Sequence, residues 1–422
     1  MIDIKIVREK PEEVKKMLEK RHSNYPLDKL IKADKKWREL KTKLENKKHE
    51  KNKVSQEIAE TKSQEQIQQM KKLKEEIKQT EQEIDAVKKE LDKLILACPA
   101  MLDETVPEGK DEQDNVEIRK WGEPKQFNFE LKNHAELIEE LNIGNFEKAA
   151  QASGRGFNYL FNDLALLDLA LQKFAIDFLM KKGHSLVTPP LMLNKKAYEG
   201  IVDMEDFENV MYKIQDENNY LIATAEHPLI ALFANEVIPE EQLPIKLVGV
   251  SPAFRKEIGA HGVDTRGLFR MHQFNKVEQI ILSKPEDSKK YLEELHANAE
   301  ELYKALEIPF RTIEICAGDL SIKNAKQYDI EAWFPRQKQY KEVGSSSNCV
   351  DFQSRALNIK YGKRGGNKEY VHTLNATGIA TSRALVAILE NNQQEDCSII
   401  IPKVLVPYMN GKTKILKNKE IL

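Results

Sequence analysis

Hydrophobic residues recur every seven positions along the first hundred residues, in two separate registers. The first register, with a second apolar position three residues later, consists of Leu30, Ala33, Trp37, Leu40, Leu44, Val54 and Ile58. The second consists of Met70, Leu73, Ile77, Ile84, Val87, Leu91 and Leu94. Apolar residues that alternate three and four positions apart are typical of the a and d positions of a coiled coil.

The two registers do not join into one. The apolar seam weakens over residues 61–66, and the first register does not reach Met70 when it is extended in steps of seven. One continuous helix is the alternative, but the break favours two helices of about 32–35 residues that run antiparallel. The first glycine is Gly109, and the absence of glycine before it also favours helix. We therefore expect a helical hairpin over residues 28–97.

The composition changes after the hairpin. Prolines, glycines and acids in 98–123 predict a linker. Beyond it, apolar spacing predicts helices over 163–180 and 382–392, and β-type runs predict strands over 245–250, 277–282, 311–315 and 328–334. The last run alternates apolar and polar residues, which is typical of an antiparallel sheet. The predicted class is α+β, with an N-terminal domain at 1–108 that carries the coiled coil and a catalytic domain at 109–422.

The distribution of charged residues along the chain limits the kinds of partner that we expect it to bind. The 422 residues include 66 Lys and Arg against 68 Asp and Glu, for a net charge of −2. This excludes a globally basic nucleic-acid binder but allows a local patch. Residues 29–53 supply such a patch, with eleven basic and four acidic side chains. The alternative for this stretch is the ordinary solvated flank of a coiled coil.

Membrane, secretion and metal signals are weak. No apolar run reaches the roughly 18 residues of a membrane span, and the N-terminus has no apolar signal region. The cysteines are scattered and form no C-x-x-C pair, at Cys98, Cys316, Cys349 and Cys397. We therefore expect no membrane partner, no zinc ribbon and no disulfide framework, in a protein of a reducing compartment.

The densest chemical signal is the segment 251–278. Between two predicted strands it contains three glycines together with the basic side chains Arg255, Lys256, His261, Arg266 and Arg270. Such a flexible cationic loop is suited to bind a polyanion, although a solvated charged hairpin is the alternative. Neither a G-x-G-x-x-G nor a P-loop pattern occurs, so no Rossmann or P-loop nucleotide site is indicated.

The spacing within this segment resembles a known family. Phe254-Arg255-x-Glu257, followed by Arg270-xxx-Phe274-xxx-Glu278, resembles motif 2 of class II aminoacyl-tRNA synthetases, here residues 252–278, and the residues between are similar to the seryl-tRNA synthetase version. Further segments resemble other elements of that family in the same order: Pro189-Pro190 within 183–191 (motif 1), Thr224-Ala225-Glu226 (the T-x-E motif), Glu342 to Asn348 followed by Asp351-Phe352-Gln353, and Asn375 to Arg383 within 374–392 (motif 3). The helical hairpin predicted over residues 28–97 resembles the tRNA-binding arm of the same family. With this arm, the resemblance covers almost the whole chain.

The resemblance implies a serine–tRNA ligase with a class II catalytic domain. Such an enzyme activates serine with ATP and Mg²⁺, forms seryl-adenylate and diphosphate, and transfers serine to the 3′ end of tRNA(Ser). It also implies a cytoplasmic homodimer that grips tRNA through the basic arm, and serylation of tRNA(Sec) where the organism has that tRNA. A zinc-dependent variant of the family is disfavoured, because the chain has a coiled-coil arm and no metal-ligand cluster.

The resemblance also assigns residues. Arg255 and Arg383 are the catalytic candidates, because two anions must approach each other and an arginine fork binds carboxylate and phosphate oxygens. The serine-binding candidates are Thr224, Ala225, Glu226, Glu278, Asn375 and Thr377. The ATP-binding candidates are Arg255, Lys256, Glu257, Arg270, Met271, Phe274, Glu342, Val343, Gly344, Ser345 and Arg383. Glu342, with Ser345 alongside, is the candidate ligand for Mg²⁺, which prefers oxygen donors.

Some of these assignments have a simpler alternative. Arg383 alone fits a helix-surface arginine equally well, and Glu342 fits an edge-strand glutamate. Thr224 and Glu226 fit a helix N-cap with an acid in the first turn. Departures from the family pattern are Ala376-Thr377-Gly378 where Gly-Ser-Gly is usual, Ser382 where glycine is usual, and Gly-Ser-Ser-Ser at 344–347. Two other functions compete: a synthetase-like enzyme that loads a carrier protein, which the basic arm disfavours, and a coiled-coil scaffold without catalysis.

Overall fold

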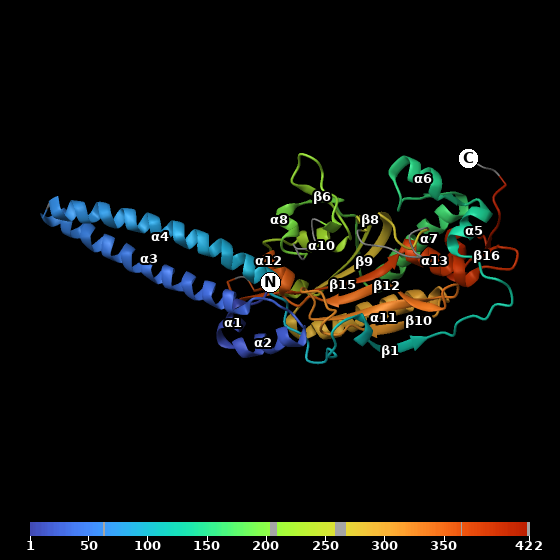
Figure 1. Ribbon diagram of the computed structural model, residues 1–422, viewed down its shortest axis with the longest axis horizontal. Helices are drawn as coiled ribbons and strands as arrows, with labels where there is room; N and C mark the ends of the chain where they lie inside the picture. The colour runs from blue at the N-terminus through green and yellow to red at the C-terminus, as the bar shows by residue number, and fades with distance from the viewer. Residues whose placement is uncertain (62–63, 203–208, 258–266, 364, 420–422) are drawn as a thin grey trace. The chain divides into compact units, whose positions relative to one another are not determined.

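The computed structural model describes residues 1–61, 64–202, 209–257, 267–363 and 365–419 (Figure 1). The chain forms two compact units, Met1–Pro99 and Ala100–Leu422. Each has its own set of buried apolar side chains. No helix of the described part is both long enough and apolar enough to cross a membrane.

The first unit contains the predicted helical hairpin. Two short helices, α1 (Ile4–Glu9) and α2 (Pro11–Lys20), precede the long helices α3 (Leu27–Thr61) and α4 (Gln64–Ala97), which lie side by side along their lengths (Figure 1). The apolar seam between the long helices is made by Trp37, Leu40, Leu44, Ile77, Ile84 and Val87. These are a and d positions of the two heptad registers, so the predicted hairpin is confirmed.

Charged side chains add contacts along the hairpin. Lys47 Nζ lies 2.7 Å from Glu76 Oε2, and Lys48 Nζ lies 2.8 Å from Glu81 Oε1, so both ion pairs join α3 to α4. At the base, the buried Asp34 carboxylate accepts hydrogen bonds from Arg8 and Arg38. That contact fixes α1 against α3, although the heptads predict neither α1 nor α2.

The second unit is built on an eight-stranded sheet, in the order β1-β10-β11-β12-β15-β9-β8-β4. Its strands are β1 (Val116–Trp121), β4 (Ser185–Val187), β8 (Ile245–Phe254), β9 (Gln273–Ser283), β10 (Phe310–Glu314), β11 (Lys326–Phe334), β12 (Gln339–Asn348) and β15 (His372–Ala380). Every neighbouring pair is antiparallel except β4 with β8. The mainly antiparallel sheet and its four predicted strands are confirmed.

The predicted linker over 98–123 is wrong in part. Residues Val116–Trp121 form the edge strand β1, which pairs antiparallel with β10. Five of its six residues are exposed, so no buried face gives this strand an apolar alternation. Further upstream, the Ala100 N–H donates to the Ile322 carbonyl oxygen at 2.7 Å, so the start of the segment is also tied to the second unit.

Helices α7 (Asn162–Lys181), α11 (Ser288–Ala305) and α13 (Thr381–Asn392) pack on the sheet. Along β9, Val277 and Ile281 point into this helix-covered layer, and Gln279 Nε2 donates to the Leu295 carbonyl oxygen of α11. Because side chains alternate along a strand, Lys276 and Glu278 point to the opposite face. That opposite face carries the candidate site.

The remaining elements are short. The helices are η1 (Glu112–Asp114), α5 (His134–Leu141), α6 (Phe146–Ser153), α8 (Lys195–Tyr198), α10 (Glu226–Ala231), η2 (Glu240–Gln242), η4 (Pro285–Asp287), α12 (Phe352–Ala356) and η5 (Lys403–Met409). The strands are β2 (Gly144–Asn145), β3 (Tyr159–Leu160), β5 (Met192–Asn194), β6 (Asn219–Leu221), β7 (Val237–Pro239), β13 (Lys360–Gly362), β14 (Lys368–Tyr370), β16 (Ile399–Ile400) and β17 (Lys414–Ile415).

Candidate active site

Sheet register brings the sequence motifs together. Glu278 on β9 pairs with Thr377 on β15, and Asn375 on β15 pairs with Ser347 on β12. Directly paired residues of antiparallel strands point to the same face. Residues from motif 2, motif 3 and the segment after Glu342 therefore meet on one face of the sheet.

A first cavity of about 100 Å³ lies on this face. It is lined by Arg255, Glu257, Phe269, Arg270, Met271, Phe274, Lys276, Glu342, Val343, Gly344, Ser345, Thr377, Ala380, Ser382 and Arg383. The lining includes every predicted ATP-binding residue except Lys256, whose backbone N–H donates to the Val210 carbonyl oxygen. His261 and Arg266 of the cationic loop lie outside the described residues.

Arg255 is part of the wall of this cavity. Its guanidinium carbon lies 5.3 Å from the centroid of the Phe274 ring, and its Nε donates to the Ala223 carbonyl oxygen at 3.3 Å. Burial lowers the pKa of Arg255, and the nearby Arg383 cation lowers it further. The pairing of a guanidinium with an aromatic face is favourable, and it leaves the edge of the fork available to anions.

Arg383, at the start of α13, holds Glu342. Its Nη1 lies 3.1 Å from Glu342 Oε2 and donates to the Glu342 carbonyl oxygen at 2.8 Å. The Glu342 side chain is 46% exposed, and the Arg383 cation lowers the pKa of its carboxyl group. Glu342 is therefore a carboxylate on a central strand at neutral pH. Arg383 lies in the cavity wall and also packs over the Phe269 ring, 5.2 Å from its centroid.

Glu257, three residues after the end of β8, has an unusual backbone conformation. Its φ is +47°, which turns the chain sharply just after β8. Its carboxylate lies 3.9 Å from Arg270 Nη1. An acceptor and a cation thus lie together in the wall of the cavity that Phe274 also lines.

A second cavity of about 360 Å³ adjoins the first. It is lined by Val202, Val210, Met211, Ala223, Thr224, Glu226, His227, Arg255, Lys276, Ser321, Lys323, Asn324, Gln327, Ser345, Ser347 and Asn375. Three residues, Arg255, Lys276 and Ser345, line both cavities. The two spaces therefore meet at a cationic boundary.

The structure distributes the predicted serine-binding residues unevenly. Thr224, Glu226 and Asn375 line the second cavity, whereas Thr377 lines the first, beside Arg383. A register shift between Thr377 and Ile379 interrupts the regular pairing of β15 at this point. The Ala225 side chain packs in the apolar core with Leu229, so its contribution is packing beneath the site.

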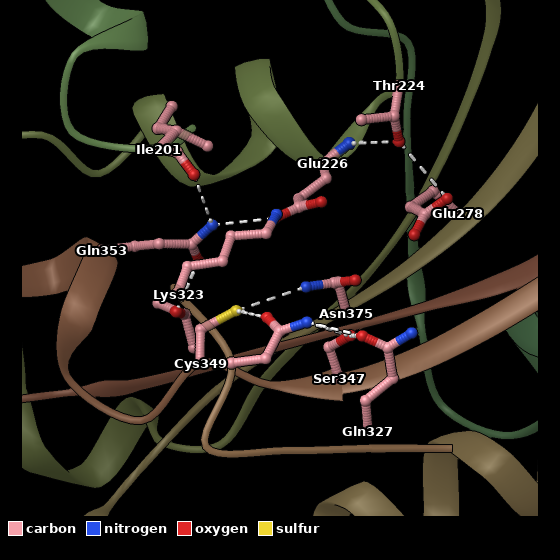
Figure 2. A network of polar contacts seen from close by, with 12 residues as sticks. Ile201, Thr224, Glu226, Glu278, Lys323, Gln327, Ser347, Cys349, Gln353 and Asn375 are labelled. Carbon is pink, nitrogen blue, oxygen red and sulfur yellow. Dashed lines mark hydrogen bonds and ion pairs between the residues drawn. The ribbon is translucent and has the colours of Figure 1, made fainter. Parts of the chain in front are cut away.

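Glu278 is buried beside the second cavity. Its Oε2 lies 2.6 Å from Lys276 Nζ. The same oxygen lies 3.4 Å from Thr224 Oγ1, as Figure 2 shows. Burial raises the pKa of Glu278, and the Lys276 cation partly offsets this effect. The Thr224 hydroxyl also accepts from the Glu226 N–H at 3.2 Å, so it contacts both Glu278 and the first residue of α10.

Glu226 is buried and held by two donors. Lys323 Nζ and Gln353 Nε2 each lie 2.7 Å from its Oε1. Burial alone would raise the pKa of Glu226, but the Lys323 cation reverses the effect, and the pKa falls to about 2. The next residue, His227, is also buried, and burial lowers its pKa to about 3. At neutral pH this wall therefore carries a carboxylate and an uncharged imidazole.

Sequence reasoning missed two basic residues of the site. Lys276 lies inside motif 2, and the alternation of Phe274, Lys276 and Glu278 on one face of the strand is a signal that could have found it. Lys323 lies in the loop between β10 and β11, where no motif marks it. Among the described residues, no group of three or more His, Cys, Asp or Glu side chains is arranged to hold a metal ion.

Comparison with known proteins places this fold and site in a class. Residues 212–392 match the model of the tRNA synthetase class II core domain for Gly, His, Pro, Ser and Thr. Residues 1–102 match the model of the seryl-tRNA synthetase N-terminal domain. The second unit is thus a class II aminoacyl-tRNA synthetase core.

Full-length relatives narrow the class to a family. A serine–tRNA ligase of Methanocella arvoryzae is 47% identical over 97% of this chain and 99% of its own. A seryl-tRNA synthetase from Pyrococcus horikoshii, solved in complex with ATP, superimposes with a TM-score of 0.95 at 44% identity, covering 99% of this chain and 100% of that one. The cytoplasmic enzyme from Naegleria fowleri, solved with AMP, gives a TM-score of 0.89 at 35% identity, covering 99% of each chain. The chain belongs to the seryl-tRNA synthetase family, and with it to the ATP-dependent ligases that join serine to tRNA.

Proposed function

We propose that this chain activates serine with ATP in the two adjoining cavities and then transfers it to the 3′ end of tRNA(Ser). The observation that carries the proposal is the shared boundary of the cavities, formed by Arg255, Lys276 and Ser345. A nucleotide in the first cavity and an amino acid in the second would meet at that cationic boundary. There the carboxylate must attack the α-phosphate.

Arg255 and Arg383 supply the positive charge for this step. The serine carboxylate and the α-phosphate repel each other, so a fixed cation between them lowers the barrier. Arg255 lies at the boundary and binds both anions through its fork. Arg383, which lines the first cavity, binds the terminal phosphates. Phe274 stacks on the adenine, and Glu257 accepts a hydrogen bond from its exocyclic amine.

Glu342 and Ser345 are the residues that would hold Mg²⁺. Both supply oxygen donors, both line the first cavity, and Glu342 remains ionised beside Arg383. When bound, the ion neutralises charge on the phosphate oxygens of ATP. The chain's own contribution is to fix Glu342 at the cavity wall through the Arg383 contact.

Serine binds in the second cavity. Thr224, Glu226 and Glu278 offer a hydroxyl and two carboxylates to the ammonium and hydroxyl groups of serine, and Asn375 lines the same space. A site built to pair with a hydroxyl rejects alanine, because its own buried polar groups would be left without partners. Thr377 would act from the neighbouring cavity, at the boundary with the phosphates.

The helical arm is the proposed tRNA-binding element. The eleven basic residues within 29–53 lie on α3, and most are exposed. An extended basic helix of this kind binds an RNA backbone by shape and charge, with strong dependence on salt. The same arm would serve tRNA(Sec) if that tRNA presents the same shape.

We further propose a homodimer in the cytoplasm. Exposed apolar side chains gather near motif 1, at Leu186, Leu191 and Met192, and a second copy of the chain would cover them. All four cysteines are free, which supports a reducing compartment. Sedimentation analysis of Leu186→Asp tests the dimer: a shift to monomer supports this surface, and an unchanged dimer refutes it.

Amino-acid-dependent exchange of labelled pyrophosphate into ATP tests the central proposal. Serine should support exchange, and the adenylate should then charge tRNA(Ser). Exchange driven by glycine or alanine in preference to serine would contradict the proposed substrate. Exchange with serine but no transfer to tRNA would favour a carrier-loading enzyme, and no exchange with any amino acid would favour a scaffold.

A further inference from the structure

The loop between β10 and β11 inserts a lysine into the wall of the second cavity. Lys323 lies three residues before β11 begins, and its Nζ is 2.7 Å from Glu226 Oε1. The Lys323 and Glu226 side chains are only 17% and 7% exposed. Figure 2 shows Lys323 reaching the Glu226 carboxylate from the Gln353 side, while Thr224 and Glu278 lie on the other side. No sequence motif assigns Lys323 a role.

Lys323 is not alone in holding this oxygen. Gln353 Nε2 donates to the same Glu226 Oε1 at 2.7 Å, and Gln353 is itself oriented by the Thr373 hydroxyl, which donates to its Oε1 at 2.6 Å. Glu226 Oε2 has no hydrogen-bond partner among the described residues, and the carboxylate borders the cavity. One oxygen is therefore fixed, and the other remains available to a ligand.

The loop that carries Lys323 is anchored next to the site. Asn324 Nδ2 donates to Ser347 Oγ on β12 at 3.1 Å and to Gln327 Oε1 on β11 at 2.7 Å. Asn324 Oδ1 also accepts from Cys349 Sγ at 3.3 Å. These contacts tie the backbone beside Lys323 to two strands of the sheet, so the lysine approaches Glu226 from a fixed base.

The charged side chains of the described residues at the second cavity form two ion pairs and leave one cation, Arg255, without a carboxylate partner. Lys276 pairs with Glu278 at 2.6 Å, and Lys323 pairs with Glu226 at 2.7 Å. Among the described residues Arg255 has no carboxylate within ion-pair distance; its contacts are the Ala223 carbonyl oxygen and the Phe274 ring. The surplus positive charge of the cavity therefore lies at the group that faces the amino-acid carboxylate in the proposed reaction.

We propose that Lys323 is a positioning residue for amino-acid recognition: it fixes Glu226 Oε1 and cancels its charge, so that Oε2 accepts a hydrogen bond from serine. This inference rests on the proposed activation of serine in the second cavity. Glu226 and Glu278 then act as acceptors within neutral pairs, and the one uncompensated cation, Arg255, is matched by the serine carboxylate. Without Lys323, the buried Glu226 carboxylate loses its counter-charge and its fixed orientation.

The test is steady-state pyrophosphate exchange with Lys323→Met, which keeps most of the side-chain volume and removes the charge. The KM for serine should rise about 10- to 100-fold while the KM for ATP changes less than about threefold. Lys323→Arg, which keeps the charge, should stay within about tenfold of the wild type. The matched control is Lys326→Met: Lys326 pairs with Glu314 at 2.9 Å, and both side chains are 14% exposed, but neither lines the cavity. That control should leave the KM for serine unchanged.

A double variant separates positioning from mere stability. Glu226→Gln combined with Lys323→Met leaves no uncompensated charge, so its KM for serine should lie at least about tenfold below the product of the two single effects. Effects that simply multiply, or equal rises in both KM values, would overturn the proposal. If Lys323→Met does not fold, Gln353→Leu removes the other bond to Oε1 without changing a charge, and an unchanged KM for serine would overturn it equally. A wild-type chain without serine-dependent exchange refutes the proposed function itself, whereas normal exchange with an unaltered KM in Lys323→Met refutes only this inference.

Discussion

The two units use charged side chains in opposite ways. On the arm, Lys48 and Glu81 form an ion pair whose side chains are 52% and 48% exposed. In the site, the paired side chains of Lys276 and Glu278 are only 10% and 1% exposed. An exposed pair contributes about 0–1 kcal/mol, whereas removing one partner of a buried pair costs about 3–5 kcal/mol. Arm charges therefore act together as a field, and site charges act individually.

The difference follows from what each unit can bury. The arm is a two-helix layer whose seam is one row of apolar residues on each helix, so most of its charged side chains lie in water. The sheet of the second unit is covered by helices on one face, and on the other it holds its charged residues between neighbouring strands and α10. If the two units are separable in function as they are in structure, a change in one unit should leave the activity of the other intact.

Removal of the arm should have the largest effect, and only on the second half-reaction. A chain that lacks residues 35–90 keeps the whole second unit, so serine-dependent exchange should stay within about threefold of the wild type. Charging of tRNA should fall by about 10³-fold or more, because the phosphate contacts that supply most RNA affinity are gone. Parallel exchange and charging assays measure both. If charging survives, the tRNA-binding role of the arm is wrong.

Loss of Arg255 should impair pyrophosphate exchange but leave tRNA binding intact, the opposite of what arm removal should do. Arg255→Ala removes the cation at the boundary of the two cavities, and exchange should fall about 10²- to 10³-fold, as expected when one preorganised group that stabilises the transition state is lost. Binding of tRNA should stay near the wild-type level, since the arm is intact. Arg311→Ala is a suitable control, because Arg311 is half-buried and paired with Glu331 outside both cavities. Undiminished exchange in Arg255→Ala would refute its role.

The helical arm and motif 2 show which features of the fold and the site could be predicted from the sequence alone. The hairpin was predictable because a coiled coil is a local, repeated pattern, and the seam residues are those of the heptads. Arg255 and Glu278 could be predicted as site residues because the spacing of the segment that contains them resembles motif 2. Both signals lie within short stretches of chain.

The missed features depend on partners distant in sequence or on irregular backbone. Lys323 contacts Glu226 across 97 positions, and nothing near either residue in the chain indicates the pair. Strand β1 is defined by its partner β10 and has no apolar face of its own. Thr377 faces the first cavity at the register shift in β15, a detail that spacing along the motif does not encode.

Neutralising exposed arm lysines should have a moderate and graded effect. Lys43 and Lys53 are exposed on α3, unlike Lys47, which is paired with Glu76. Changing both to Gln should weaken tRNA binding by roughly 10-fold and reduce the slope of log K against log salt by about 1–2, one step for each lost phosphate contact. Binding titrations at several salt concentrations measure this slope, and exchange should not change.

The control for this pair lies on the second unit. Lys338 and Lys403 are exposed there, and their replacement by Gln removes the same net charge from the chain. If the field of the arm is what binds RNA, this control leaves the affinity and the salt slope near the wild-type values. An equal loss in both double variants would mean that net charge alone, and no localised patch, sets the affinity.

The smallest expected effect is a pH dependence of stability confined to the second unit. His184 is 3% exposed, and neither ring nitrogen has a hydrogen-bond partner among the described residues. Burial lowers its pKa to about 4, and the Lys246 cation adds to the shift. The unfolded chain, with an ordinary histidine pKa near 6.5, binds a proton below that pH, while the folded chain does not bind it until about pH 4. Stability contributed by this site is therefore present above about pH 6.5 and is lost as the pH falls toward 4.

His184→Leu removes that proton linkage. Between pH 7 and pH 5 the wild type should lose about 1–2 kcal/mol more unfolding free energy than the variant. Urea unfolding, followed through the tryptophans of the second unit (Trp121 and Trp333) after Trp37 is changed to Phe, measures the difference. His49→Gln on the exposed face of α3 is the control, because it also removes one histidine but from the other unit. A profile that His184→Leu leaves as steep as the wild type would mean that other buried groups of this unit carry the linkage, and that burial of this one imidazole has no measurable consequence.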